Sequence, residues 1–105
     1  IDYNGRQIDG DTEDVISLGD LPGKWRAFGW EVLEMDGHNV TEIVATLAKA
    51  KAMTGNGKPI VIIMTTEMGQ GVDFMMGSHK WHGVAPNDEQ LASALNQLTE
   101  TLGDY

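Results

Sequence analysis

Pro59-Ile60-Val61-Ile62-Ile63-Met64-Thr65 decides the fold of this chain. The run from Ile60 to Met64 is apolar without alternation, rich in β-branched residues and too short for a helix. A strand of this kind must bury both of its faces, which is typical of a central strand in a parallel sheet. We therefore predict an α/β protein.

A strand and a helix are predicted before this segment. Residues 30–36 alternate apolar with acidic side chains, which indicates a short strand. Asn39 or Thr41 then caps a helix, whose apolar positions from Val40 onward keep a 3.6-residue period until Thr54-Gly55. Strand, helix and strand together predict a right-handed crossover unit.

The flanking segments complete the expected order of elements. Residues 1–4 resemble the end of a strand, residues 4–14 read as loop, and Leu21 to Gly29 predict one or two helical turns around Pro22. Asn87 or Asp88 should cap a helix that runs to about Leu102 and packs on the sheet.

The predicted fold is part of a doubly wound, Rossmann-like three-layer sandwich, with a short, mostly parallel sheet and flanking helices. It forms a single domain over residues 1–105. Such a narrow sheet leaves edges that a complete domain would pair, and the chain starts at Ile1 as if a strand had lost its beginning. We therefore expect a fragment.

Composition excludes several classes of function. Sixteen acidic and seven basic residues give a net charge of −9, which disfavours nucleic-acid binding. No apolar run is long enough to span a bilayer. The absence of cysteine excludes disulfides and thiolate zinc sites, and is compatible with a cytoplasmic location.

Asn4 and Arg6 are the first candidates for chemistry. Asn4 directly follows the first strand, at the edge where ligands of open α/β sheets bind. Its amide oxygen could coordinate a hard cation, with the backbone carbonyl of Arg6 as a second ligand. The alternative is a plain Asn-Gly turn.

The long loop from Thr66 to Pro86 holds the other candidates. Gly69 and the glycines that follow it would let backbone or ligand approach closely, although their spacing fits neither nucleotide-binding fingerprint. His79 and His82 lack further zinc ligands, so a single catalytic or anion-binding histidine is favoured over a metal pair, with structural hydrogen bonding as the alternative. His38 is interpreted as structural.

Five segments in the same order resemble the second half of the thiamine-diphosphate-binding domain of transketolases. They are Asp2-Tyr3-Asn4-Gly5-Arg6-Gln7-Ile8-Asp9-Gly10, Ala27-Phe28-Gly29-Trp30-Glu31-Val32 with Asp36-Gly37-His38, Lys58-Pro59, Thr66-Glu67-Met68-Gly69-Gln70-Gly71, and His82-Gly83. The resemblance covers nearly the whole chain.

The resemblance implies roles for individual residues. Asn4 and the carbonyl of Arg6 match two ligands of the Mg²⁺ that binds the diphosphate of thiamine diphosphate. Ile8 and, with methionine in place of the usual isoleucine, Met68 match the apolar contacts near the thiazolium ring. Gly69, directly after Met68, is expected to bind the cofactor with them. His82 matches the histidine that reaches the diphosphate and the reacting substrate.

Other parts of the family pattern are missing. The Gly-Asp-Gly motif, which supplies a further metal ligand, would lie upstream of Ile1, and the pyrimidine-binding domain is also absent. The resemblance implies a parent enzyme that transfers a two-carbon ketol group between sugar phosphates, with the remaining transketolase domains as partners. We expect the isolated chain to be inactive. The alternative is a non-catalytic α/β module that acts through self-assembly or partner binding.

Overall fold

The structure, a computed structural model, describes residues 1–99. Its elements are β1 (Asp2–Tyr3), β2 (Arg6–Gln7), β3 (Gly10–Asp11), α1 (Thr12–Val15), α2 (Leu21–Ala27), β4 (Glu31–Asp36), α3 (Val40–Ala52), β5 (Ile60–Thr65), the 3₁₀ helix η1 (His79–Trp81) and α4 (Asp88–Gln97).

The main sheet has three parallel strands in the order β1-β5-β4. The segment Ile60–Thr65 is its central strand, as its continuous apolar run predicted. Thr65 pairs with Tyr3 on one side and with Asp36 on the other. The carboxyl ends of the three strands therefore meet at one edge of the sheet.

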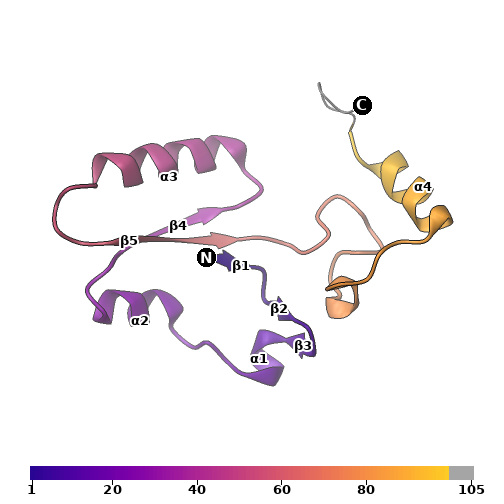
Figure 1. The fold of residues 1–105 in the computed structure, drawn as a ribbon, viewed down its shortest axis with the longest axis horizontal. Helices are drawn as coiled ribbons and strands as arrows, with labels where there is room; N and C mark the ends of the chain where they lie inside the picture. The colour runs from indigo at the N-terminus through magenta and orange to yellow at the C-terminus, as the bar shows by residue number, and fades with distance from the viewer. Residues whose placement is uncertain (100–105) are drawn as a thin grey trace.

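Helices cover both faces of this sheet, with α3 on one side and α2 on the other (Figure 1). The register explains why both faces are apolar. Leu33 pairs with Ile62, whereas Ile63 pairs with Glu34 in the next row, so buried Leu33 and buried Ile63 face opposite sides. The three-layer α/β architecture is confirmed.

Side-chain caps begin α2, α3 and α4, and Asn39 and Asn87 are among the caps predicted from the sequence. Asn39 Oδ1 accepts the backbone N–H of Glu42 at 3.2 Å at the start of α3, and Asp20 Oδ1 accepts that of Gly23 at 2.8 Å in α2. Asn87 and Gln90 form a reciprocal capping box in α4. These caps satisfy N–H groups that have no partner within their helices.

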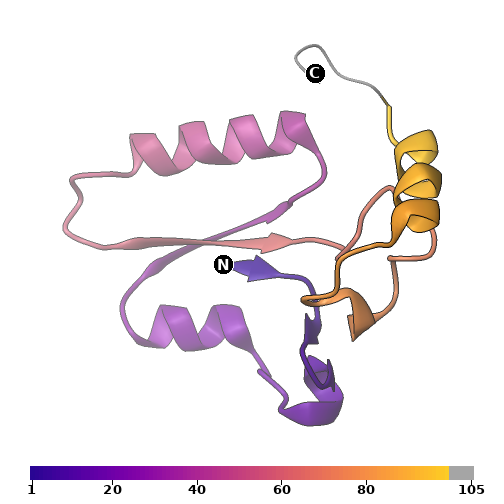
Figure 2. The same ribbon diagram turned by 45° about the vertical axis from the view of Figure 1, so that its right-hand side comes forward.

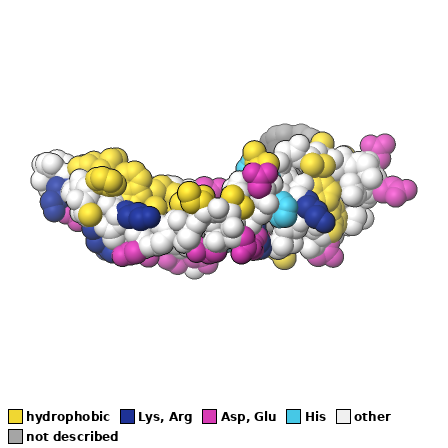
Figure 3. Space-filling view, turned by 90° about the horizontal axis from the view of Figure 1, so that it is seen from below, with side chains coloured by type: hydrophobic (Ala, Val, Ile, Leu, Met, Phe, Trp, Pro, Cys, Tyr) yellow, Lys and Arg dark blue, Asp and Glu magenta, His cyan; other side chains and the backbone are white. Residues whose placement is uncertain are grey.

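The described part of the chain forms a thin slab. Its extents are 51 × 38 × 16 Å, and its radius of gyration is 17.0 Å, against about 13 Å for a compact domain of this length. Even the most enclosed hydrophobic side chains, Ile63 and Val72, keep 5% of their surface exposed. Val40, Val44 and Leu47 form an exposed apolar stripe on α3. Figure 3 shows the narrow dimension of the slab, with hydrophobic side chains gathered at its surface.

Two predictions about the ends of the chain were wrong. Within the predicted loop 4–14 the chain forms the β2–β3 hairpin and α1, because a two-residue turn at Ile8-Asp9 and an ion pair from Arg6 to Asp11 supply local order. Helix α4 ends at Gln97, since Leu98 is extended, and the expected end at Leu102 lies outside the described residues. Figures 1 and 2 both show α4 apart from the sheet rather than packed on it.

Candidate functional site

The candidate residues leave the sheet at its carboxyl edge. Tyr3 and Thr65 are paired, so Asn4 and Thr66 begin two neighbouring loops. The backbone N–H of Thr66 donates to the Tyr3 carbonyl at 3.3 Å, and its hydroxyl donates to the carboxylate of Asp2. These bonds hold the β2–β3 hairpin and the long loop together at their origin.

Asn4 forms a tight turn. Its Oδ1 accepts the backbone N–H of Arg6 at 2.9 Å, while Gly5 adopts a φ of 68° that favours glycine. The Gly5 carbonyl in turn accepts the N–H of Thr12 at 2.9 Å. The turn interpretation is therefore correct, and it does not exclude the metal hypothesis, because an amide oxygen has a second lone pair.

The side chain of Arg6 anchors the hairpin. Its guanidinium donates to Asp11 on the partner strand β3. This hydrogen bond, with smaller contributions from the charges of Asp11 and Glu67, raises the pKa of Arg6 above its ordinary value. The side chain is thus engaged within the protein, and only the backbone carbonyl of Arg6 is a candidate metal ligand.

Ile8 and Gln7 differ in their surroundings at the tip of the hairpin. Ile8 is 66% exposed, so it has apolar surface available for a ligand or another segment. Gln7 carries a buried amide nitrogen, Nε2, that has no hydrogen-bond partner within the described residues. A buried donor of this kind is unfavourable unless a partner arrives.

The long loop is closed at its base by Glu67. Its backbone N–H donates to Nε2 of His38 at 2.7 Å, and its Oε1 accepts the N–H of Gly77 at 2.7 Å. Gly69 follows with a φ of 73°, and a Cβ at this position would lie 2.5 Å from the Cβ of Met75. The close approach predicted at Gly69 is therefore present, and the chain's own backbone makes it.

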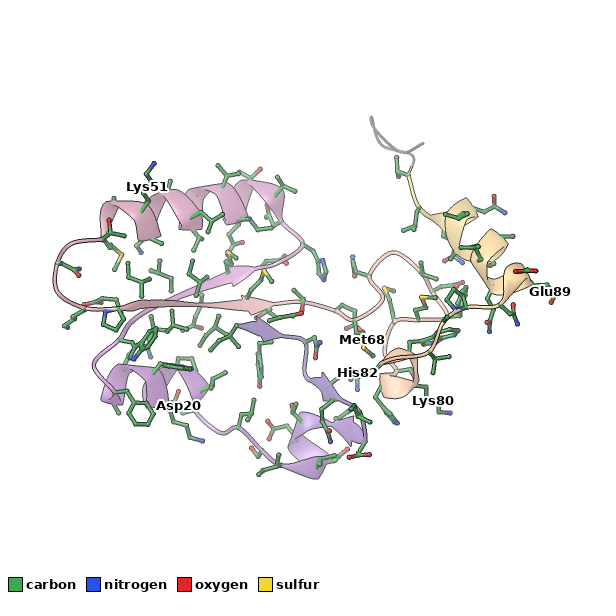
Figure 4. The ribbon with its side chains drawn as sticks, in the orientation of Figure 1. Asp20, Lys51, Met68, Lys80, His82 and Glu89 are labelled. Carbon is green, nitrogen blue, oxygen red and sulfur yellow. The ribbon has the colours of Figure 1, made fainter. Side chains whose placement is uncertain are left out.

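His82 follows η1 at the surface. The 3₁₀ turn is held by Trp81, whose Nε1 donates to the Phe74 carbonyl at 2.9 Å and whose ring lies 5.4 Å from that of Phe74. His82 itself is exposed. Figures 1 and 2 both place η1 beside the β2–β3 hairpin, and Figure 4 shows His82 and Met68 on the same side of the loop. The structure therefore brings both predicted segments to one edge of the sheet.

A separate open hollow of about 570 Å³ lies at the same edge, on the side of α3. Its lining residues are Glu34, Met35, Asp36, His38, Glu42, Thr65, Thr66 and Glu67. None of the predicted site residues lines it. Four carboxylates make it unsuitable for an anionic ligand, and no cluster of three metal-ligating side chains occurs within residues 1–99.

The role of Glu67 was not predicted from the sequence, whereas the structural interpretation of His38 is confirmed, because its Nε2 accepts the Glu67 N–H. A sequence signal for the contact between His38 and Glu67 is Gly37, which directly precedes His38 in the chain. A Cβ on Gly37 would lie 2.4 Å from Cγ2 of Thr66, so the turn after β4 must pack directly on the start of the long loop. This contact places His38 within reach of the Glu67 amide.

Comparison with known proteins agrees with this arrangement. The profile of the family described as "Transketolase, thiamine diphosphate binding domain" matches residues 1–101. The chain belongs to the transketolase family. The resemblance inferred from five short segments is therefore confirmed.

Several curated transketolase proteins are similar to this chain. It is 40% identical to one of the subunits of the apulose-4-phosphate transketolase of Phocaeicola vulgatus, over 97% of this chain and 36% of that protein. It is 41% identical to the 6-deoxy-6-sulfo-D-fructose transketolase subunit SqwG of a Clostridium species, over 92% of this chain and 34% of that protein. A transketolase of Sinorhizobium medicae is 34% identical to it, over 92% of this chain and 13% of that protein. This transketolase-family chain thus spans about a third of the length of the two transketolase subunits it matches.

Within the described part of the transketolase-family chain, no helix has the length and apolar character needed to cross a bilayer.

Proposed function

We propose that this chain contributes one side of the thiamine diphosphate and Mg²⁺ site of a transketolase that transfers a two-carbon ketol group between sugar phosphates. The observation that carries the proposal is the common origin of the two candidate loops at the paired residues Tyr3 and Thr65. The match of residues 1–101 to the thiamine-diphosphate-binding domain supports it.

The donors present fit part of a magnesium site. The Asn4 amide oxygen and the Arg6 carbonyl are hard oxygen ligands of the kind that Mg²⁺ prefers. Two neutral oxygens are too few for a site made by protein alone, so the remaining ligands would come from the diphosphate, water and a further carboxylate. The unpaired Gln7 Nε2 is a donor suited to an anionic group arriving beside Asn4.

Ile8 and Met68 are proposed to flank the cofactor's thiazolium ring. Ile8 is 66% exposed and Met68 is half-buried, so both retain apolar surface for contact. Apolar cover excludes water from the reacting carbon. Thiamine diphosphate, when bound, supplies the carbanion chemistry that the side chains of this protein cannot supply.

His82 is proposed as the catalytic residue. An imidazole can donate to a diphosphate oxygen or to an oxygen that gains charge during ketol transfer. Its exposed position after η1 leaves it accessible from the hairpin side. The overall charge of −9 disfavours anionic substrates, so a bound metal ion and local donors such as His82 would have to offset it.

The proposed partners are the remaining transketolase domains. Two similar proteins are named as transketolase subunits, which supports a split enzyme whose second polypeptide supplies the pyrimidine-binding domain. A cytoplasmic location is proposed with this function. Residues 1–105 by themselves are proposed to be inactive, because no Gly-Asp-Gly motif occurs among them.

Reconstitution tests this function. The chain would be co-expressed with the upstream segment and the partner polypeptide of a split relative, and ketol transfer would be measured with thiamine diphosphate and Mg²⁺. We expect turnover in the assembled protein, loss of at least about a hundredfold in His82→Ala, and little change in the control His79→Ala. A stable assembly without turnover would refute the proposal. Turnover by the isolated chain would refute its predicted inactivity.

A second candidate is a non-catalytic module that acts by self-assembly. The exposed stripe Val40, Val44 and Leu47 on α3 favours it, because a stripe of this kind is normally covered. Sedimentation of the isolated chain distinguishes the two: a defined homo-oligomer supports the module, and a monomer at high concentration contradicts it.

A further inference from the structure

Two hydrogen bonds made by Glu67 join three segments of the chain. The backbone N–H of Glu67 donates to His38 Nε2 in the turn after β4, and Glu67 Oε1 accepts the N–H of Gly77 at the far end of the loop 68–77. We infer that this arrangement, the Glu67 clasp, is a positioning device that fixes Met68 and His82 relative to the β2–β3 hairpin. The inference rests on the proposed function, in which these two residues face the cofactor.

The clasp closes a loop at both ends. Glu67 precedes the loop 68–77, and Gly77 is its last residue. The bond between them therefore brings the end of the loop back to the end of β5. Closing a loop of about ten residues costs conformational entropy, which a specific bond at its base offsets. η1 starts two residues later, at His79, so the position of this bond determines where η1 can begin.

The interior of the same loop packs on itself. The Gly69 carbonyl accepts the N–H of Val72 at 3.0 Å, and Val72 is 5% exposed. Gly69 lies against Met75. A loop with its own packed interior moves as a unit, so displacement of its base would displace η1 and His82 with it.

His38 Nε2 accepts the Glu67 N–H at 2.7 Å, which joins the turn after β4 to the start of the loop. Its surroundings are acidic: Glu34, Asp36, Glu42 and Glu67 line the same hollow. The backbone N–H of His38 is itself fixed by Asp36 Oδ1 at 2.8 Å. His38 is therefore held in place from both sides of its turn.

Hydrogen exchange of the full chain, followed residue by residue by NMR, tests the clasp without any enzyme assay. In Glu67→Ala we expect the Gly77 amide to exchange about tenfold faster, because one hydrogen bond is lost, while Ile62 and Met64 in β5 keep their rates. Glu67→Gln retains an acceptor oxygen and should restore the protection of Gly77. Glu89→Ala on α4 is the matched control, with no change expected at Gly77.

The positioning role needs a second readout. The Met68 methyl and His82 ring signals should shift in Glu67→Ala and return toward their original positions in Glu67→Gln. His38→Ala should speed exchange of the Glu67 amide, whereas His79→Ala should not.

Unchanged Gly77 exchange in Glu67→Ala, or equal acceleration of every amide, would overturn the clasp. Unmoved Met68 and His82 signals would overturn its positioning role. Failure of the cofactor to bind refutes the proposed function instead, since none of these signals requires cofactor.

Discussion

The backbone N–H of Arg6 donates to the side-chain oxygen of Asn4 at 2.9 Å. The acceptor of this bond is the Asn4 amide oxygen, which is the first proposed metal ligand. The donor belongs to Arg6, whose carbonyl is the second, so the bond fixes the turn that carries both ligands. The geometry of the turn and the chemistry of the site therefore depend on the same asparagine.

Asn4→Asp and Asn4→Ala test the role of the Asn4 side chain in the turn. Aspartate keeps an oxygen that can accept the Arg6 N–H, so we expect urea unfolding close to that of the original chain. Alanine loses the bond and should cost about 1 kcal/mol. Equal stability of Asn4→Ala and the original chain would show that the turn does not depend on the side chain.

Gly69→Ala should destabilise the chain more than a glycine replacement elsewhere. The new Cβ would meet Met75 at 2.5 Å and would also be strained by a φ of 73°, so we expect a loss of about 2–4 kcal/mol by urea unfolding. Gly57→Ala is the matched control, because Gly57 has a φ of 83° but nothing within 4 Å of an added Cβ. Its cost should be about 1–2 kcal/mol. Equal losses would mean that the loop yields around Met75.

Much of the fold was readable from the sequence because local signals and long-range pairing agreed there. The unbroken apolar run Ile60 to Met64 identified the central strand, and Asn39 marked the start of α3. Both elements follow from periodicity and capping, which depend on near neighbours. The family assignment followed from short segments in order and is confirmed.

What the sequence did not reveal depends on contacts between distant residues. The bonds of Glu67 to His38 and Gly77 span 29 and 10 positions, and no local pattern encodes them. The hairpin was read as loop because its strands have only two residues each and its Arg6–Asp11 pair appears as scattered charge. The roles of Asn4, Arg6, Ile8, Met68, Gly69 and His82 stay predictions.

Gln97 should hold α4 to the rest of the chain. Its Oε1 accepts the N–H of Asp73 at 2.8 Å, and its Nε2 donates to the Asp73 carboxylate at 2.9 Å. Because α4 lies apart from the sheet, we expect Gln97→Ala to accelerate amide exchange throughout α4 while β5 keeps its protection. The control Asn96→Ala should leave both unchanged. Loss of protection in β5 as well would mean that α4 and the sheet unfold together.

Gln7→Met should leave the isolated chain as stable as before or make it more stable. The Gln7 Nε2 atom is buried without a partner among the described residues, and a buried unsatisfied donor costs about 1–3 kcal/mol, whereas methionine has similar length and no donor. Urea unfolding of the two proteins measures the difference, with Gln90→Met as a control that should lose stability, since Gln90 completes the capping box of α4.

The same Gln7→Met substitution has the opposite expected effect on the reconstituted enzyme. If Gln7 donates to an incoming anion beside Asn4, its loss should raise the apparent Kd for thiamine diphosphate by about tenfold to a hundredfold, because a hydrogen bond to a charged group contributes roughly 1.5–3 kcal/mol. A variant that is less stable alone would show that Gln7 already has a partner. If the variant is more stable and its Kd for thiamine diphosphate is unchanged, the unpaired Gln7 donor is a packing defect and does not bind the cofactor.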